Sequence, residues 1–243
     1  MFWIIQEDLY IENRRYDLVS ALERFSIPYQ LVTLKDNSLE PEVYHSGSII
    51  TNGSIKLSRI ANERGWKPGS MFNENFNYEV WFPIFHNYLL NRDAIFTTIE
   101  DADSPWDTFF VRPINDDKSF TGKITTRADF SVLKASIAPN LKILLAPSKI
   151  IGQEHRHYIV NGKVISSSRY KLGGSVNYSN QVDDYIINFA QCMADIWCPA
   201  DAFVLDTYVA GNEIGIVEIG CLCHAGLYAS DVQKIVMALE ELG

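Results

Sequence analysis

The chain has 243 residues, 47% of them hydrophobic, with a formal net charge of −9 and a pI of about 5.0. This length allows one large domain or two small ones with buried cores. The acidic balance argues against nucleic acid polymers, which need a basic surface. No apolar run approaches the roughly 20 residues of a membrane span, and the first residues lack a basic signal-peptide start. We therefore expect an intracellular, cytoplasmic protein that binds no nucleic acid polymer and no membrane.

The first hundred residues alternate between strand and helix patterns, which predicts a parallel sheet. A turn at Asn52-Gly53-Ser54 leads into a helix that stops at Gly65, a typical residue after a helix end. Such a turn can hold an anion or simply connect a strand to a helix. We expect residues 1–98 to form a small Rossmann-like α/β lobe. Strands are predicted at 2–5, 29–34, 48–51 and 94–98, and helices at 16–25, 55–64 and 79–90.

An acidic, turn-forming stretch at residues 100–105 marks a boundary. Beyond it, strands at 108–112 and 123–126 flank a polar loop and predict an antiparallel hairpin. In this loop Lys118 offers a charge to phosphate oxygens, and Gly122 permits close backbone approach. A charged hairpin tip is the alternative, since the chain has neither a Walker P-loop nor a GxGxxG motif.

Asn161-Gly162 predicts a two-residue hairpin turn between strands at 154–160 and 163–170. A regular register then pairs Val160 with Lys163, Arg156 with Ser167, and Glu154 with Arg169. These polar residues share one face, while His155, His157 and Ser168 share the other. Two arginines held by a strand carboxylate would form an anion-binding platform. An exposed edge with a Glu154–Arg169 ion pair is the alternative.

Residues 203–220 predict a second hairpin, with a three-residue loop at Gly211-Asn212-Glu213. If Val209 pairs near Ile214 or Gly215, Asp206 lies opposite Val217 or Glu218. Like charges across an antiparallel pair are destabilising unless something offsets them. Mg²⁺ with substrate phosphates would do so; an acid pair on a solvated face is the alternative. Helices are predicted on either side of this hairpin, at 181–197 and 231–242.

The four cysteines are Cys192, Cys198, Cys221 and Cys223, and His224 follows the last of them. Neither Cys-x5-Cys nor Cys-x-Cys is a usual spacing for structural zinc. Without a secretory signal we also expect no disulfide framework. The sequence favours ordinary buried thiols.

Several motifs, in order, resemble the ATP-grasp superfamily. More narrowly, they resemble its divergent clade named for one arginine and two lysines, which also contains the eukaryotic assembly factor for translation initiation factor 2. The resemblance extends from about Ile49 to the C-terminus. The motifs are Thr-Asn-Gly-Ser-Ile and Arg-Gly-Trp-Lys-Pro-Gly in the first lobe, then Phe-Val-Arg-Pro, Asp-Asp-Lys-Ser-Phe-Thr-Gly, Glu-His-Arg-His-Tyr-Ile-Val, Ser-Arg-Tyr, Leu-Asp, Val-Glu-Ile and Ala-Gly-Leu-Tyr.

The resemblance implies an N-terminal Rossmann-like pre-ATP-grasp lobe (1–98), followed by a two-subdomain ATP-grasp domain (99–243) of α/β and α+β class. The subdomains would be about 99–145 and 146–243, with ATP between them. Asp206 and Glu218 would hold Mg²⁺, and Arg156, oriented by Glu154, would face the γ-phosphate or an acyl phosphate together with Arg169. Arg112 and Lys118 would meet the ATP phosphates under a covering loop with Ser119, Thr121 and Gly122, and the segment with Leu145, Ala146, Ser148 and Ile150 would line the adenine.

One departure from the family pattern concerns Gly220, where relatives usually have an asparagine as a further metal ligand. The neighbouring Cys-Leu-Cys-His stretch also replaces one that commonly contains Asn and Pro. The resemblance implies an ATP- and Mg-dependent ligase that joins a carboxylate to an amine, with a small molecule, peptide or protein as substrate. The alternative is an ATP-binding assembly factor without turnover, which Gly220 favours.

Overall fold

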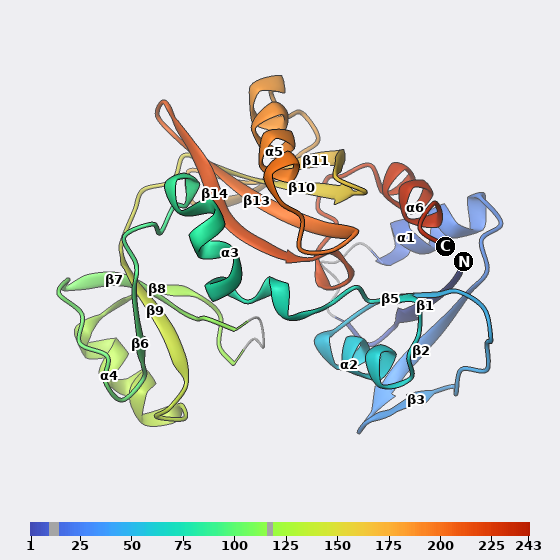
Figure 1. Ribbon diagram of the computed structural model, residues 1–243, viewed down its shortest axis with the longest axis horizontal. Helices are drawn as coiled ribbons and strands as arrows, with labels where there is room; N and C mark the ends of the chain where they lie inside the picture. The colour runs from blue at the N-terminus through green and yellow to red at the C-terminus, as the bar shows by residue number, and fades with distance from the viewer. Residues whose placement is uncertain (10–14, 116–118) are drawn as a thin grey trace. The chain divides into compact units, whose positions relative to one another are not determined.

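The computed structural model describes residues 1–9, 15–115 and 119–243 (Figure 1). These residues form two compact units. The first joins residues 1–73 to residues 152–243, and the second is the continuous stretch 74–151. The first unit contains two five-stranded sheets and the second a four-stranded sheet. The fold is therefore mixed α/β, in agreement with the sequence.

The N-terminal sheet has the strand order β3-β2-β1-β4-β5. Strand β1 is parallel to β2 and β4, and β4 is parallel to β5, so the predicted parallel sheet is confirmed. Ser54 caps the helix that follows β4 by accepting a hydrogen bond from the Leu57 amide, and Gly65 lies just beyond its end with a φ of 67°. The elements are β1 (Phe2–Gln6), α1 (Arg15–Arg24), β2 (Tyr29–Lys35), β3 (Ser38–Glu40), β4 (Ile49–Asn52), α2 (Ile55–Glu63) and β5 (Pro68–Gly69).

The other sheet of the first unit is antiparallel, in the order β12-β11-β10-β13-β14. Helix α5 contacts β10, β11 and β13, and α6 contacts β10, β11 and the N-terminal helix α1. The C-terminal helix therefore packs on two strands of this sheet and on a helix of the N-terminal part of the unit. The elements are β10 (Gln153–Val160), β11 (Lys163–Leu172), β12 (Ser175–Ser179), α5 (Asp184–Ile196), β13 (Ala202–Ala210), β14 (Glu213–Cys221), η4 (Leu222–His224) and α6 (Val232–Glu240).

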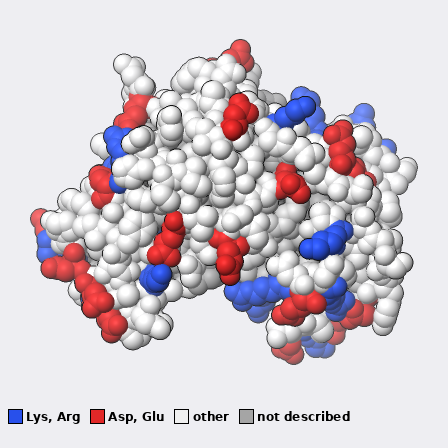
Figure 2. Space-filling model, in the orientation of Figure 1, with Lys and Arg blue, Asp and Glu red and all other residues white. Residues whose placement is uncertain are grey.

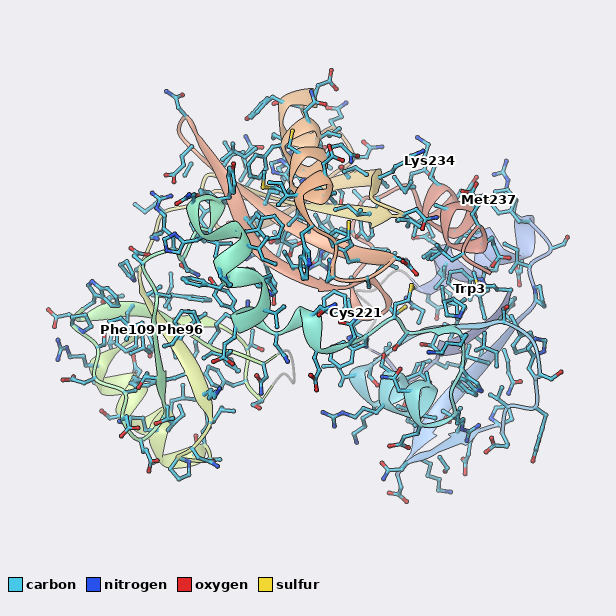
Figure 3. All side chains as sticks on the ribbon, in the orientation of Figure 1. Trp3, Phe96, Phe109, Cys221, Lys234 and Met237 are labelled. Carbon is cyan, nitrogen blue, oxygen red and sulfur yellow. The ribbon has the colours of Figure 1, made fainter. Side chains whose placement is uncertain are left out.

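The second unit is built on the antiparallel sheet β6-β9-β7-β8. Its core includes Phe109, Val111, Phe130 and Leu145, and Phe109 is labelled in Figure 3. The strand predicted at 94–98 in the N-terminal lobe is β6, and it pairs with β9 in this sheet. The boundary at residue 98 between a first lobe and the domain that follows it stays a prediction. The elements are η2 (Glu74–Phe76), α3 (Tyr78–Phe85), η3 (His86–Tyr88), β6 (Ile95–Thr98), β7 (Thr108–Pro113), β8 (Lys123–Thr126), α4 (Arg127–Ser136) and β9 (Lys142–Pro147).

The β10–β11 and β13–β14 hairpins, which carry predicted site residues, both depart from a regular register. In the β10–β11 pair, β11 carries one extra residue at each of two bulges, Ile165 and Tyr170. The regular pairing expected beyond Val160 and Lys163 is therefore wrong. The β13–β14 turn has two residues, Gly211 and Asn212, and not the expected three, because Ala210 pairs with Glu213. A bulge shifts every following side chain relative to the partner strand.

Among the described residues, no helix combines the length and apolar character needed to cross a membrane.

Candidate functional site

Three charged residues lie side by side across the second sheet of the first unit. The Cα of Arg156 on β10 faces Asp206 on β13, and Asp206 faces Glu218 on β14. The pairing of Asp206 with Val217 or Glu218 was expected, and the structure selects Glu218. A bulge between Asp206 and Thr207 causes this, because it leaves Val217 without a partner. The bulge thus brings both predicted metal ligands to one level of the sheet.

Arg156 and Asp206 form a buried, two-pronged ion pair. Arg156 Nε donates to Asp206 Oδ1 and Nη2 donates to Oδ2, each at 2.8 Å. Their side chains are 13% and 5% exposed. Burial raises the pKa of Asp206 above its ordinary value, although Arg156 lowers it. Burial lowers the pKa of Arg156, but Asp206 outweighs this and raises it, so the guanidinium stays charged. A buried carboxylate of this kind depends on its cationic partner.

Glu154 is held by a tyrosine and a lysine from β11. Tyr170 Oη donates to Glu154 Oε2 at 2.8 Å, and Lys171 Nζ donates to Oε1 at 3.0 Å. The Tyr170 hydroxyl also lies 3.3 Å from Asp206 Oδ2. The expectation that Glu154 orients Arg156 is therefore corrected, because Asp206 binds the guanidinium. The bulge at Tyr170 directs two consecutive β11 side chains toward Glu154.

Aromatic rings surround the Arg156 guanidinium. Its central carbon lies 4.7 Å from the ring centroid of Tyr228 and 5.8 Å from that of Tyr170. Tyr228 stacks on Tyr170 at 5.0 Å and on Tyr178 at 5.4 Å. Tyr228 has a φ of 45°, a conformation that costs energy for a bulky residue and often occurs at functional sites. Cation–π contacts of this type hold a guanidinium in one orientation.

Arg169 lies away from this cluster. Its Cα partner is His155 and not Glu154, so it shares the face of His155. Its guanidinium donates to Asn177 Oδ1 from Nε at 3.1 Å and from Nη2 at 2.7 Å. The predicted platform of two arginines on one face is therefore wrong, and so is the Glu154–Arg169 ion pair. The cation that joins Glu154 is Lys171.

Ser168 and His157 also show the effect of the bulges. Ser168 is paired with Arg156 and shares its face, contrary to expectation. Among the described residues, its fully buried Oγ has no hydrogen-bond partner. His157 lies on the opposite face, 2.8 Å from Ser167 Oγ through Nδ1 and 2.9 Å from Thr207 Oγ1 through Nε2. Burial lowers the pKa of His157 to about 3, so its ring is neutral.

In the second unit, Arg112 and Gly122 lie together on the β7–β8 hairpin. Arg112 Nε donates to the Pro113 carbonyl at 3.1 Å, and the guanidinium lies 5.5 Å from the ring centroid of Tyr78. A Cβ added at Gly122 would lie 2.9 Å from Phe110 Cζ and 3.1 Å from Arg112 Cβ. Only glycine therefore lets the loop pass so close to Arg112. Ser119 and Thr121 are exposed, and Lys118 lies outside the described residues.

The predicted adenine segment divides into a buried and an exposed part. Leu145 and Ala146 are fully buried on β9, where they pair with Val111 and Phe110. Ser148 is exposed, and Ile150 is 95% exposed. Lys149 Nζ donates to Asp93 Oδ1 at 2.7 Å, so it joins this segment to the turn before β6.

The cysteines and the metal-ligand types are distributed as follows. Cys221 and Cys223 are buried, Cys198 is partly buried and Cys192 is exposed, all as free thiols. Cys221 Sγ donates to the Ser70 carbonyl at 3.2 Å. In the described part of the chain, no three His, Cys, Asp or Glu side chains gather as a metal site. Within that part, Asp206 and Glu218 are thus a pair of carboxylates without a third ligand of these types.

The sequence predicted no role for Tyr170, Lys171 or Tyr228, although Tyr170 lies in the Ser-Arg-Tyr motif. Tyr170 and Lys171 reach Glu154 only because of a bulge, which has no sequence signal in this strand. Tyr228 belongs to the Ala-Gly-Leu-Tyr motif already singled out, and its position directly after a glycine-containing turn offered a signal.

Solved structures share this fold over nearly the whole chain. The D-cycloserine synthetase DcsG has a TM-score of 0.70 at 12% identity, with 100% of both chains covered. D-alanine–D-alanine ligase from Bacillus anthracis, in complex with ATP, has a TM-score of 0.66 at 13% identity, covering 100% of this chain and 96% of the ligase. The ATP-grasp ligase PsnB with a minimal precursor has a TM-score of 0.60 at 10% identity, covering 99% and 98%. At these identities the likeness establishes the fold.

A search of curated protein sequences found no match to this chain. A family profile matches residues 89–238, more than half of the chain, and it describes an ATP-grasp domain of family 2 in the clade named for one arginine and two lysines. This stretch includes Arg112, the Arg156–Asp206 pair and Glu218. The order of motifs, the fold and the family match agree, and the chain belongs to the ATP-grasp superfamily, in family 2 of that clade.

Proposed function

We propose that this protein is an ATP- and Mg-dependent ligase that joins a carboxylate to an amine through an acyl phosphate. The observation that carries the proposal is the row Arg156, Asp206 and Glu218 across three adjacent strands, within a chain of ATP-grasp family. Relatives of the same fold include ligases solved with ATP and with a precursor peptide. These support ATP as cosubstrate and an amino acid or a peptide as the substrate class.

The carboxylate pair suits a magnesium ion by its donor chemistry. Mg²⁺ prefers oxygen ligands and is commonly held by one or two carboxylates together with substrate phosphates. Asp206 and Glu218 are paired across β13 and β14. Burial raises the pKa of Asp206, and the charge of Glu218 adds to the rise. The ion would supply positive charge to the phosphate oxygens of ATP. Arg156 supplies the positive charge next to Asp206 in the described structure.

The chain's own groups are assigned to position the substrates and to stabilise the negative charge of the phosphates. A substrate carboxylate oxygen attacks the γ-phosphorus of ATP, which forms an acyl phosphate and releases ADP. An amine then attacks the acyl carbon, and phosphate and one proton leave as the amide forms. Arg156 is assigned to the transferred phosphoryl group and Arg112 to the ATP phosphates. Arg169 is assigned only an indirect role, because it lies on the other face of the sheet.

A second candidate function is an ATP-binding assembly factor without turnover. Gly220 favours it, because the family usually has a metal-ligating asparagine there. A Cβ at this position would lie 3.5 Å from Val204 Cγ2, an ordinary contact, so the backbone has room for a Cβ. The missing side chain is therefore a property of this sequence and does not follow from crowding.

The first test is calorimetric titration of ATP, with and without Mg²⁺, into the wild type and into Asp206→Asn and Glu218→Gln. We expect micromolar binding, about −8 kcal/mol, that weakens by about tenfold or more without Mg²⁺ and in both variants. Asp201→Asn removes an exposed carboxylate just before β13 and should bind like the wild type. Circular dichroism checks that each variant is folded.

Turnover is then measured as ADP release in the presence of amino acids and peptides that carry free carboxylates and amines. ADP release that requires both substrates supports the ligase. Stoichiometric nucleotide binding without ADP release under any of these conditions would favour the assembly factor. Absence of ATP binding by folded wild type would contradict both candidates.

A further inference from the structure

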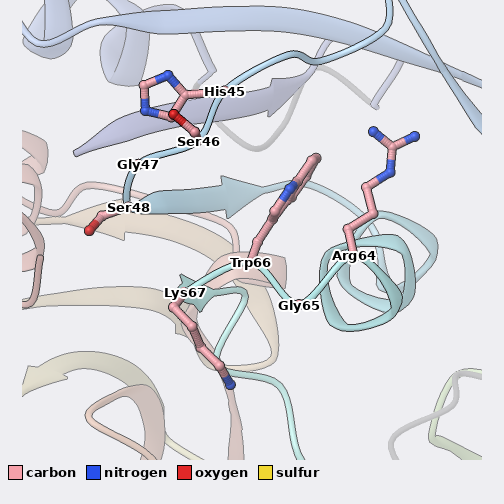
Figure 4. Close-up of a pocket in the computed structure, with 8 residues that line it drawn as sticks. All are labelled: His45, Ser46, Gly47, Ser48, Arg64, Gly65, Trp66 and Lys67. Carbon is pink, nitrogen blue, oxygen red and sulfur yellow. The ribbon is translucent and has the colours of Figure 1, made fainter.

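A polar pocket lies in the first unit, at the amino ends of two parallel strands (Figure 4). It is lined by residues 45–48, directly before β4, and by residues 64–67, directly before β5, and its volume is about 610 Å³. Asn52 and the start of α2 lie at the other end of β4. The pocket is therefore separate from the carboxyl ends of this sheet, and it contains none of the residues assigned to ATP.

An arginine stacked on a tryptophan forms one side of the pocket. The Arg64 guanidinium lies 5.3 Å from the ring centroid of Trp66, and Arg64 Nη1 pairs with Glu42 Oε1. Figure 4 shows the Trp66 side chain between the segment that carries His45 and the Arg64 side chain. A guanidinium has five N–H donors in a rigid fork. Glu42 fixes one end of this fork, and the Arg64 side chain is 29% exposed.

On the opposite side of the pocket, ring stacking and a backbone hydrogen bond hold the loop that carries His45. The His45 ring stacks on Phe2 with centroids 4.5 Å apart and an interplanar angle of 15°. A Cβ at Gly47 would lie 2.8 Å from His45 Nε2, so the glycine lets the loop fold closely around this ring. Phe2 also donates its backbone N–H to the Ser48 carbonyl at 2.9 Å. These contacts fix the loop before any ligand arrives, which lowers the entropy cost of binding.

The charge of the lining is unusual for this protein. Its eight residues include Arg64 and Lys67 and no Asp or Glu, although Glu42 pairs with Arg64 from outside the lining. The whole chain, in contrast, has a net charge of −9. On the face shown in Figure 2, basic and acidic side chains alternate over the part of the first unit that includes α2. Most of the lining residues are exposed. An open, cationic and polar pocket differs from the apolar clefts that enclose small ligands, and suits an extended chain that carries carboxylates.

We propose that this pocket binds an acidic segment of a peptide or protein. A carboxylate of the segment pairs with the N–H donors of Arg64 that Glu42 does not occupy. A second carboxylate lies near Lys67, and the aliphatic part of a Glu or Asp side chain packs on Trp66. Arg–carboxylate pairs are the strong, geometrically specific form of such contacts. The site recognises its partner without nucleotide, so its test is independent of the proposed ligase activity.

The experiment follows the indole N–H signal of Trp66 by NMR in the ¹⁵N-labelled full chain, with assignment from Trp66→Phe. A blocked hexaglutamate peptide is titrated in, with hexaglutamine as the uncharged match and inorganic phosphate as the small anion. We expect hexaglutamate to shift this signal, and Arg64→Gln and Lys67→Gln each to weaken binding by about tenfold or more. Arg24→Gln is the matched control, because Arg24 is an exposed arginine in the last turn of α1.

Three results would overturn the proposal. Equal shifts with hexaglutamine would show that charge is not recognised. Equal weakening by Arg24→Gln would show diffuse electrostatics and no site. A shift with phosphate but not with hexaglutamate would assign the pocket to small anions. Unfolding curves verify that each of the three charge variants is folded. If either Arg64→Gln or Lys67→Gln fails to fold, the other variant still tests the pocket.

Discussion

At the scale of single residues, the candidate site is a set of buried charges that neutralise one another. Asp206 accepts from Arg156 at both oxygens, and Glu154 accepts from Tyr170 and Lys171. Buried ion pairs contribute little net stability, but removal of one partner leaves an uncompensated charge. A ligand that binds one of these residues must therefore replace the charge partner that the residue has in the described structure.

The first prediction concerns Tyr170→Phe. The variant loses the hydroxyl that donates to Glu154 at 2.8 Å, and the site is only 8% exposed. We expect a loss of about 1–3 kcal/mol in the free energy of unfolding, because a buried carboxylate loses a donor. Urea denaturation measures it. Tyr178→Phe, at a half-exposed ring, should change stability by less than about 0.5 kcal/mol, and an equal effect of both variants would contradict the prediction.

At the scale of secondary-structure elements, β10 separates two kinds of chemistry by its alternation. Glu154 and Arg156 lie on one face, and His155 and His157 on the other. Both histidines are buried, with 1% and 0% exposure. Burial lowers the pKa of His155 to about 4, with a further contribution from Arg169, and burial lowers that of His157 to about 3.

The second prediction is that stability falls as the pH is lowered from about 6.5 towards 4. In this range the unfolded chain protonates these histidines, with an ordinary pKa of 6.5, and the folded chain does not. The unfolded state thus binds more protons, and the free energy of unfolding decreases by about 1.4 kcal/mol per pH unit for each histidine. Urea denaturation at pH 7.5 and 5.0 measures this. His157→Gln should reduce the pH dependence, and an unchanged dependence would exclude His157 as a cause.

The third prediction concerns the loop that returns onto β7. Gly122→Ala places a methyl group 2.9 Å from Phe110 and 3.1 Å from Arg112 Cβ. We expect a loss of about 1–3 kcal/mol in unfolding free energy from overpacking, together with weaker ATP binding if Arg112 meets the phosphates. Gly220→Ala is the matched control, since its added Cβ has only an ordinary contact at 3.5 Å. Equal denaturation midpoints for both variants would refute the steric argument.

At the scale of the whole molecule, the first unit is assembled from both ends of the chain. Trp3 on β1 is 1% exposed, and its indole Nε1 donates to Glu240 Oε1 of α6 at 2.6 Å. Trp3 is labelled in Figure 3. Residues 1–73 and 152–243 therefore fold as one compact unit, with residues 74–151 inserted between them.

The fourth prediction is that Glu240→Ala destabilises this unit. The buried Trp3 indole loses its acceptor, and the Met1 ammonium loses its ion pair with Glu240 Oε2. Together these losses should lower the free energy of unfolding by about 1–3 kcal/mol. Urea denaturation measures the change. Glu241→Ala removes the same charge from the neighbouring exposed position and should change stability by less than about 0.5 kcal/mol. A comparable loss in both variants would attribute the effect to net charge.

The sequence by itself determined the family and the parallel N-terminal sheet. It also determined that Asp206 pairs with Val217 or Glu218 across a hairpin. It could do so because these features follow from local periodicity, turn residues and motif order. Only the tertiary structure decided which side chains meet at the site. Single extra residues at Ile165, Tyr170 and Val217 reset the pairing of β11 and β14, since side chains alternate with a period of two. The bulges become visible only in the paired strands, where they place Lys171 opposite Glu154 and Arg169 on the opposite face.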